Sequence, residues 1–151
     1  HILEDVEEDF ASKIQAGDIF VVGSGFGTGK HLNGPIGALR HLGVAAVLAK
    51  SFSSVWERDS INLGFPSLQY PQVWDHVDTG DVLELDVRAT RACNLTRNEI
   101  FDVRPTPAGV LELLEAGGIA PYTTRLLGIP DTGAVTQVST RVQARTESGD
   151  G

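Results

Sequence analysis

The sequence predicts an α/β fold, and three features of the chain support that prediction. Short runs of aliphatic and β-branched residues alternate with segments of helical periodicity, as expected for strands connected by helices. Residues 19–49 have the length of a strand–helix–strand crossover. The chain has 151 residues, of which 41% are hydrophobic and 21% charged. This is enough for one self-sufficient core and too little for two large domains.

The first expected strand is residues 19–22, an apolar run rich in β-branched residues that ends at a glycine. An acidic segment, residues 1–15, precedes it and carries Phe10 and Ile14 at helical spacing. The glycine-rich residues 23–29 follow the strand. They would connect it to the first helix of the crossover.

That helix is expected to begin near Pro35, which suits a first helical position, with Asn33 or Gly34 as its cap. Gly43 would end it, and residues 44–49 would form a second buried strand. The inner face of the helix would carry Ile36, Leu39 and Leu42.

A further helix is expected to begin at a Ser51 cap and to end at Gly64. Residues 65–80 contain prolines and glycine and are expected to be mostly connection. Residues 82–87 alternate like a half-exposed strand, and residues 99–103 are expected to form another strand, with pairing between the two left open. The inner face of the helix that begins at Ser51 would carry Phe52, Val55 and Trp56.

The last expected helix opens at residues 106–107 and closes at residues 117–118, and a turn or short helix follows over residues 122–127. The inward side of the longer helix would carry Val110, Leu111 and Leu114. The remaining residues are polar and lack periodicity. We therefore expect one domain over residues 1–130 and a polar tail over residues 131–151.

Charge and cysteine content exclude several classes of protein. With 12 basic and 20 acidic residues the net charge is −8, which disfavours nucleic acids and anionic membranes as partners, and no apolar stretch is long enough to span a membrane. Cys93 is the only cysteine, so this chain alone makes no internal disulfide, structural zinc site or iron–sulfur cluster. We expect a cytoplasmic protein with no cofactor of its own. Because the chain has no Met and opens at His1, we also expect a fragment or a processed chain.

The densest chemical signal is Gly-Ser-Gly-Phe-Gly-Thr-Gly-Lys-His over residues 23–31. A phosphate-binding Walker loop fails on spacing, because Ser24 stands where it needs Gly and His31 where it needs a hydroxyl. The dinucleotide fingerprint fails because Thr28 or Lys30 stands at its third glycine. Closely spaced N–H groups before a helix would still favour a carboxylate or phosphate. The alternative is a tight connection in which Lys30 is solvated.

Residues 17–29 resemble the G-D-I-x-V-x-G-E-N-F-G-x-G segment of the aconitase-superfamily swivel domains. The nearest branch is the small subunit of isopropylmalate dehydratase and its homoaconitase relatives. The resemblance runs from about His1 to Leu127, through A-L-x-x-L-G at 38–43, A-K-S-F at 49–52 and R-x-x-I-N-x-G-x-P at 58–66.

The resemblance implies an α/β swivelling domain with a mixed sheet or barrel-like core and packed helices. It also implies a hydro-lyase acting on a hydroxy-polycarboxylate, with an iron–sulfur cluster held by a separate large subunit, consistent with Cys93 as the sole cysteine. The front strand and recognition loop of the family would precede His1 and are expected to be missing from this chain.

The family's active-site triplet Ser-Ser-Arg is replaced here by Lys30, His31 and Leu32. In the family the first Ser is the general base and the Arg binds a substrate carboxylate, which Leu32 cannot do. Lys30 and His31 are therefore the candidate catalytic residues of a rebuilt site. The candidate substrate-binding residues are Gly27, Thr28, Gly29 and Arg58, although an ion pair with Glu57 or Asp59 explains Arg58 as well.

Two functions stay open at this point. The chain is either the small subunit of an aconitase-like dehydratase that closes over a cluster-bearing large subunit, or a stand-alone, cluster-free homologue. The second would be an isomerase, a cyclase or a binding protein, as a homodimer, that uses Lys30 and His31. No metal site is expected, since the histidines are scattered, and Asn94-Leu95-Thr96 matches a glycosylation sequon without other signs of secretion.

Overall fold

The computed structural model of the chain describes residues 14–29, 33–129 and 142–146. Its seven-stranded sheet has the strand order β3-β2-β1-β7-β4-β5-β6. The strands are β1 (Ile19–Val22), β2 (Ala46–Ala49), β3 (Ser67–Gln69), β4 (Val82–Asp86), β5 (Arg91–Asn94), β6 (Glu99–Asp102) and β7 (Val142–Thr146). The helices are α2 (Asn33–His41), α3 (Ser54–Asn62), α4 (Val73–His76), α5 (Ala108–Ala116) and α6 (Ile119–Leu126). The expected α/β class with a mixed sheet is confirmed.

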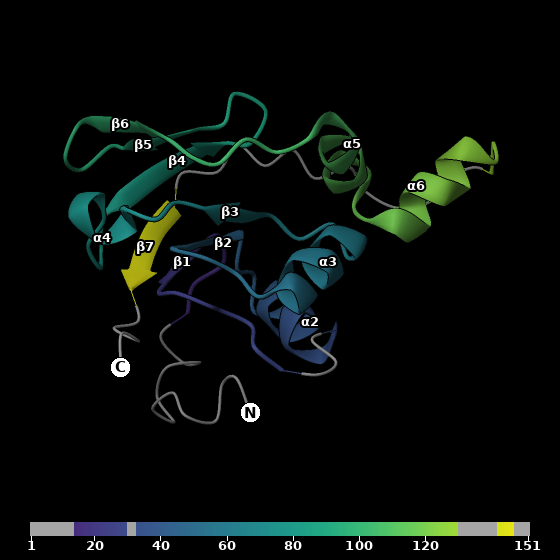
Figure 1. The fold of residues 1–151 in the computed structure, drawn as a ribbon, viewed down its shortest axis with the longest axis horizontal. Coiled ribbons are helices and arrows are strands. Elements are labelled where there is room, and N and C mark those ends of the chain that lie inside the picture. Colours follow the sequence, from purple (N-terminus) through teal and green to yellow (C-terminus); the bar gives the residue numbers. More distant parts are fainter. Residues whose placement is uncertain (1–13, 30–32, 130–141, 147–151) are drawn as a thin grey trace.

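The sheet has a parallel half and an antiparallel half that face one another. β1 pairs in parallel with β2 and with β7, and β2 pairs in parallel with β3. β4 pairs antiparallel with β7 and β5, and β5 pairs antiparallel with β6. Figure 1 shows the antiparallel strands lying over the parallel ones, with β7 passing between the two halves. The sheet therefore encloses a core between its own halves.

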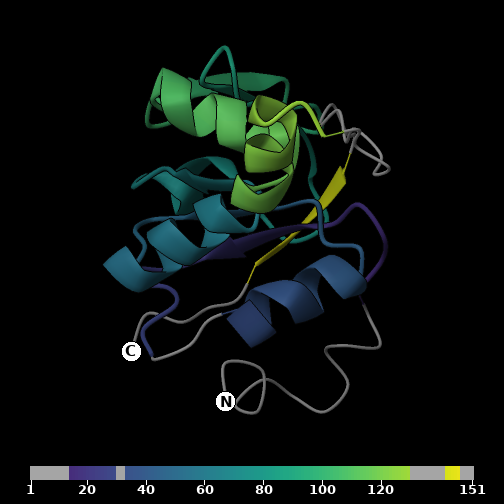
Figure 2. The ribbon, with the colours of Figure 1, turned by 90° about the vertical axis from the view of Figure 1, so that its right-hand side faces the viewer.

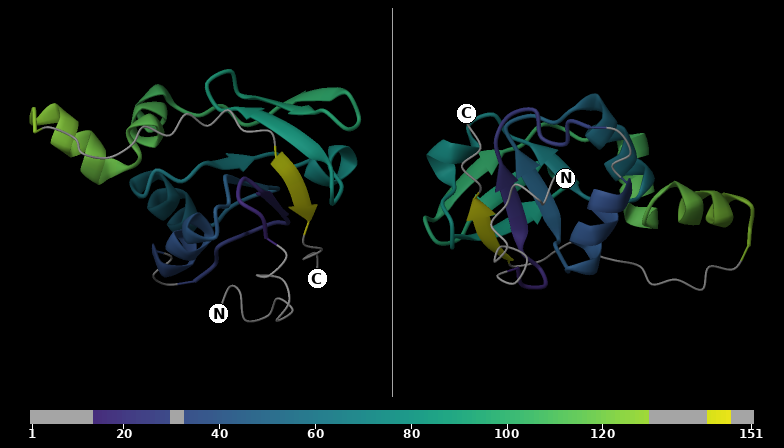
Figure 3. Two further views of the ribbon diagram at one scale, coloured as in Figure 1. Left: turned by 180° about the vertical axis from the view of Figure 1, so that it is seen from behind. Right: turned by 90° about the horizontal axis from the view of Figure 1, so that it is seen from below.

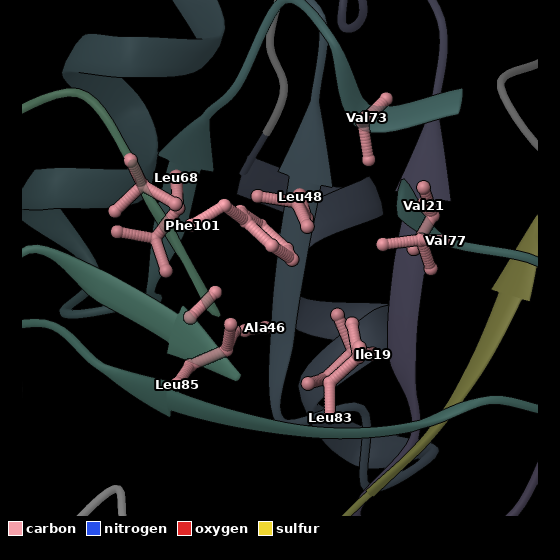
Figure 4. Packing of buried hydrophobic residues seen from close by; sticks show 12 residues of the cluster. Ile19, Val21, Ala46, Leu48, Leu68, Val73, Val77, Leu83, Leu85 and Phe101 are labelled. Atoms are coloured by element: carbon pink, nitrogen blue, oxygen red, sulfur yellow. The ribbon is translucent and has the colours of Figure 1, made fainter. Parts of the chain in front are cut away.

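This inner core is built from alternate residues of the facing strands. Ile19 and Val21 of β1 point into it, and Leu83 and Leu85 of β4 meet them from the opposite half (Figure 4). The short helix α4 closes one end and is anchored there by Val73, which is fully buried. Burial of these aliphatic side chains is the main favourable term that holds the two halves together.

The other face of the parallel strands is covered by α2 and α3 (Figure 2). A second hydrophobic cluster joins Phe20 and Val22 of β1 to Ile36 and Leu39 of α2 and to Trp56 of α3. The parallel strands are thus buried on both faces, which explains why residues 19–22 and 46–49 are apolar at every position. The expected inward positions Ile36 and Leu39 are confirmed.

α5 and α6 lie beside α3, and α6 extends outward from the rest of the chain (Figures 1 and 3). The approach to α3 is close, since a Cβ on Gly64 would lie 2.2 Å from the carbonyl carbon of Gly117. Gly117 ends α5 in a left-handed conformation, as the sequence predicts. Val110, Leu111 and Leu114 are only partly buried.

The start of α3 differs from the expectation. Ser53, not Ser51, is its N-cap: Ser53 has an extended backbone and its hydroxyl accepts a hydrogen bond from the Trp56 N–H at 3.1 Å. Residues 65–80, expected to be mostly connection, contain two regular elements, β3 and α4. These elements span only three and four residues, too few for a periodic pattern to develop.

Two pairings in the sheet also differ from the expectation. Residues 99–102 form β6, which pairs with β5 and not with β4. β5 was not expected, because its residues are of mixed polarity, and it pairs in turn with β4. Val142–Thr146 lies within the segment expected to be a polar tail, yet it forms β7 between β1 and β4. β7 is held by backbone hydrogen bonds to the strands on both sides, which do not depend on a periodic side-chain pattern. The sequence of this segment therefore does not predict a strand.

The rest of residues 131–151 and the acidic residues 1–13 lie outside the described part of the chain. Within the described ranges, no helix combines the length and the hydrophobicity needed to cross a membrane.

Candidate functional site

The glycine loop, residues 23–29, leaves the carboxyl end of β1, where β2 and β3 also end. The backbone continues in register past the strand ends: the Lys50 N–H donates to the Val22 carbonyl at 3.2 Å, and the Tyr70 N–H donates to the Ala49 carbonyl at 2.8 Å. The first residues after the three strands, Gly23, Lys50 and Tyr70, therefore lie side by side. Ligands of open α/β sheets bind at this carboxyl edge.

The glycine loop is tied to the segment that leads into α3. Phe26 and Phe52 form an isolated parallel bridge, in which the Phe26 N–H donates to the Ser51 carbonyl at 3.0 Å and the Ser53 N–H donates to the Phe26 carbonyl at 2.9 Å. The Ser51 hydroxyl accepts from the Gly25 N–H at 2.8 Å. The hydroxyl of Ser53 donates to the Gly27 carbonyl at 2.5 Å. Ser51 thus anchors the loop instead of capping the helix.

An aromatic cluster lies beneath the loop. The ring of Phe26 lies 4.6 Å from that of Trp56, centroid to centroid, in an edge-on arrangement. The ring planes of Phe52 and Trp56 are nearly parallel, and the two rings stack at 6.3 Å. Trp56 is fully buried, and its indole N–H donates to the Ser67 hydroxyl at 3.0 Å. Phe52 and Trp56 therefore support the loop from inside the fold.

The structure places the predicted loop residues as follows. Gly27 is buried against Trp56, whereas Thr28 and Gly29 are exposed. Lys30 and His31, the candidate catalytic residues, lie outside the described residues, and so does Leu32. Their roles, and the binding roles of the three loop residues, stay predictions.

Arg58 lies on α3 with 67% of its side chain exposed. Its Nε atom donates to the Asp59 carboxylate at 3.0 Å, and the Asp59 side chain is mostly buried. The ion pair weighed as the alternative for Arg58 is therefore present. An exposed pair of this kind adds little stability, so it does not decide whether Arg58 also contacts a substrate.

Sequence reasoning missed a group of polar side chains at the same carboxyl edge. The ammonium of Lys50 lies 5.8 Å from the ring centroid of Trp74, within the range of a cation–π contact. Trp74 lies on the short helix α4. On the same helix, His76 Nδ1 lies 3.1 Å from a carboxylate oxygen of Glu99. The only signal available was the position of Lys50 directly after a predicted strand.

Tyr70 completes this group, and its ring stacks on Phe101 at 4.5 Å. Burial raises the pKa of Tyr70, and the nearby carboxylates of Asp75, Glu99 and Asp102 raise it further. The phenol is therefore neutral across the physiological pH range.

A cavity of about 250 Å³ lies between α3, β3 and residues 104–110. Its charged lining is internally paired: Arg104 donates to Gln69 at 2.8 Å and to Glu57 at 3.3 Å. The positive charge in this cavity is thus already balanced by a neighbour.

The described residues do not fit an iron–sulfur cluster. Cys93 lies half-buried on β5, and no group of three or more His, Cys, Asp or Glu side chains gathers in the described part of the chain. Cluster ligands are typically several cysteine thiolates.

Asn94 of the sequon is fully buried. Its amide group donates to the His76 carbonyl and the Asp81 carboxylate, both at 2.7 Å. Its carbonyl oxygen accepts from the N–H groups of Thr96 and Arg97. Asn94 is a structural hub and is not accessible to glycosylation in the folded chain.

Comparison with known proteins gives consistent results. A profile of the aconitase C-terminal domain matches residues 4–73. The chain is 33% identical over 131 residues to the 3-isopropylmalate dehydratase small subunit of Thermodesulfovibrio yellowstonii, covering 87% of this chain and 78% of that protein. It is 38% identical over 125 residues to the small subunit of Moorella thermoacetica, covering 83% and 75%.

A solved structure, 3-isopropylmalate dehydratase (leuD) from Methanocaldococcus jannaschii, superposes with a TM-score of 0.75 at 28% identity. The superposition covers 82% of this chain and 73% of that chain. The likeness therefore extends over most of the fold, well beyond the glycine loop.

Proposed function

This chain belongs to the family of 3-isopropylmalate dehydratase small subunits, hydro-lyases of the aconitase type, and we propose that it is the small subunit of such an enzyme and acts on a hydroxy-polycarboxylate. The observation that carries the proposal is the identity of 33% over 131 residues, which reaches across 78% of the relative. The resemblance found in the motifs is confirmed at the level of the family.

The partner in this proposal is a large subunit that carries the iron–sulfur cluster. The relatives are themselves small subunits, and the described residues of this chain offer no ligand set for a cluster. The ligands would therefore come from the partner. We place the complex in the cytoplasm, where a lone thiol such as Cys93 stays reduced.

The substrate would bind at the carboxyl edge of the parallel strands, against the glycine loop. Thr28 and Gly29 are exposed there, and a carboxylate is favoured by loop N–H groups at the start of a helix. Gly27 keeps the loop close to α3, and Arg58 on α3 would contribute a charge to substrate binding.

Lys30 and His31 would replace the family's serine as the proton acceptor. In a dehydration, the base takes a proton from the carbon next to a carboxylate, the electrons of that C–H bond form the double bond, and hydroxide leaves the neighbouring carbon. An imidazole accepts a proton near neutral pH without any change of its pKa, which favours His31 as the base. Lys30 would then bind the substrate as a cation.

Co-expression with the cluster-bearing large subunit from the same source tests this proposal. We expect the two chains to co-purify as a complex that converts hydroxy-dicarboxylates such as 3-isopropylmalate. A chain that purifies alone under the same conditions, with a large subunit that folds and holds its cluster, would contradict it.

The second candidate is a stand-alone homologue without a cluster, and the replaced Ser-Ser-Arg triplet favours it. Titratable residues at 30 and 31 permit acid–base chemistry that needs no partner. The two candidates differ in one observation: the second requires the isolated chain to convert or bind its substrate.

A further inference from the structure

We propose that residues 119–129, which comprise α6 and the turn after it, form the surface on which the large subunit docks. This inference rests on the proposed function and names the part of this chain that holds the partner. Five large hydrophobic side chains are exposed in the described part of the chain, and four of them belong to this α6 segment. The four are Ile119, Leu126, Leu127 and Ile129.

The α6 segment contributes little to the core of the described fold. None of the residues of α6 is buried, and the helix extends outward from the rest of the chain (Figures 1 and 3). Leu126 and Leu127 are 70% and 69% exposed. Single exposed hydrophobic residues are common, but several of them gathered on one projecting element are typical of a protein–protein interface.

The composition of this segment is also that of the centre of an interface. Residues 116–130 contain no Asp, Glu or Lys, although the whole chain has 20 acidic residues. Their one charged side chain is Arg125, and they include Tyr122. Interface centres are depleted in Lys, Asp and Glu and enriched in Tyr and Arg. The segment therefore combines exposure with a composition that favours burial against another protein.

Charge complementarity favours a different chain over a second copy of this one. Among the described residues, no carboxylate forms an ion pair with Arg125. A second copy would present the same patch, which has no carboxylate for this guanidinium, and two chains of net charge −8 repel one another. The proposed function supplies a different chain, the large subunit. The surface that fits is apolar, with a carboxylate opposite Arg125.

α3 connects this docking surface to the glycine loop. The junction of α5 and α6 packs on the C-terminal end of α3, where a Cβ on Gly118 would lie 2.6 Å from the Asn62 carbonyl oxygen. At the other end of α3, the Ser53 hydroxyl bonds to the Gly27 carbonyl. The nine residues of α3 span about 13 Å. A partner bound to α6 is therefore held at a fixed distance from the loop against which the substrate would bind.

Titration calorimetry of this chain with the cluster-loaded large subunit from the same source tests the docking surface. We expect Leu126→Glu and Leu127→Glu each to raise Kd about 10- to 100-fold, because a carboxylate is placed in an apolar contact. Ile100→Glu is the matched control, because Ile100 is 67% exposed but lies on β6. It should leave Kd within about twofold. Thermal unfolding checks that the three variants, all at exposed positions, keep their fold.

Arg125→Glu tests the charge separately from the apolar contact. It should raise Kd about 5- to 20-fold at low salt, and the increase should shrink at high salt, because ions screen charges at the rim of an interface. Arg91→Glu changes the net charge equally but lies on β5, where Arg91 is 59% exposed. This control should leave Kd within about twofold.

Thiol labelling shows what covers the segment. In a Cys93→Ser background, Leu126→Cys places the sole thiol of the chain on α6. We expect a maleimide to react rapidly with the free chain and at least about 10-fold more slowly after the large subunit is added. A thiol that reacts slowly in the free monomer would mean that the chain covers α6 with its own residues, which overturns the proposal.

The remaining outcomes separate this inference from the proposed function. Wild-type affinity in both leucine variants overturns the docking surface, even if the complex is an active dehydratase. A complex that depends on α6 but does not turn over 3-isopropylmalate supports the docking surface and contradicts the hydro-lyase activity. A wild-type chain that ignores the large subunit overturns both proposals. Dimers of this chain that disappear in Leu126→Glu would then identify a second copy as the occupant.

Discussion

A Cβ atom on Gly27 would lie 2.6 Å from the Cβ of Trp56, so these two residues set how closely the glycine loop packs on α3. Gly27 also has a φ of +80°, which L side chains rarely adopt. The hydroxyl of Ser53 bonds to the Gly27 carbonyl from the start of the same helix. The loop is therefore held rigidly at the edge where the substrate would bind.

Gly27→Ala should destabilise the chain by about 2–4 kcal/mol, because the new methyl group clashes with Trp56 and the left-handed backbone is strained. Gly25→Ala is the matched control: Gly25 also has a positive φ, of +66°, but faces open space, so its cost should be about 1 kcal/mol. Urea unfolding measures both. Equal losses in the two variants would show that Trp56 does not restrict the loop.

Asn94→Ala should lower the free energy of unfolding by about 2–3 kcal/mol, since the His76 carbonyl and two N–H groups lose their buried partner. Asn62→Ala, at an exposed position on α3, should change it by less than about 0.5 kcal/mol. Expression in a host that glycosylates sequons, followed by mass measurement, should show an unmodified Asn94. A glycan on the folded chain would contradict this burial.

The phenol of Tyr70 should ionise at higher pH in the folded chain than in urea, because burial raises its pKa above 10.0 and carboxylates raise it further. The Tyr122→Phe variant leaves Tyr70 as the only tyrosine, so its phenolate absorbance can be followed alone. Because the folded chain binds the phenolic proton of Tyr70 more tightly than the unfolded chain, this proton contributes to the free energy of unfolding. The contribution is complete below pH 10 and is lost as the pH rises through the folded-state pKa. Tyr70→Phe should remove that loss. Identical midpoints in buffer and urea would contradict the assignment.

His31→Ala should reduce kcat of the complex by at least about 100-fold, as expected when a general base is removed. The remaining activity should lose its rise with pH near neutrality, since that rise reflects deprotonation of the imidazole. His41→Ala, at the exposed end of α2, is the matched control. Full activity of both variants would remove His31 from the mechanism.

The parts of the fold that the sequence predicts well are those whose burial is uniform or periodic. Residues 19–22 and 46–49 are covered on both faces, so they are apolar throughout and identify themselves as strands. β5 is not recognisable as a strand from its sequence, because one of its buried residues is the polar Asn94. The hydrogen bonds of Asn94, such as the one to Asp81, make its burial possible. β7 owes its place to backbone pairing on both sides.

The site was predictable to the same limited degree. Glycine density marks the loop, but its anchoring by Ser51 and Trp56 depends on contacts made about 26 residues later in the chain, as in the bond from Gly25 to Ser51. Lys50 gains its environment from Trp74 on a helix that the sequence pattern did not indicate. Such relationships follow from the topology of the sheet, which a single sequence does not specify.

The most direct test of the central claim measures the turnover of 3-isopropylmalate by the large subunit from the same source, alone and after addition of this chain. The small subunit of Moorella thermoacetica serves as the reference for the addition. We predict that the large subunit is inactive alone and active once this chain is bound. A large subunit that is activated by the Moorella protein, but binds this chain without turnover of any hydroxy-dicarboxylate, would contradict the claim.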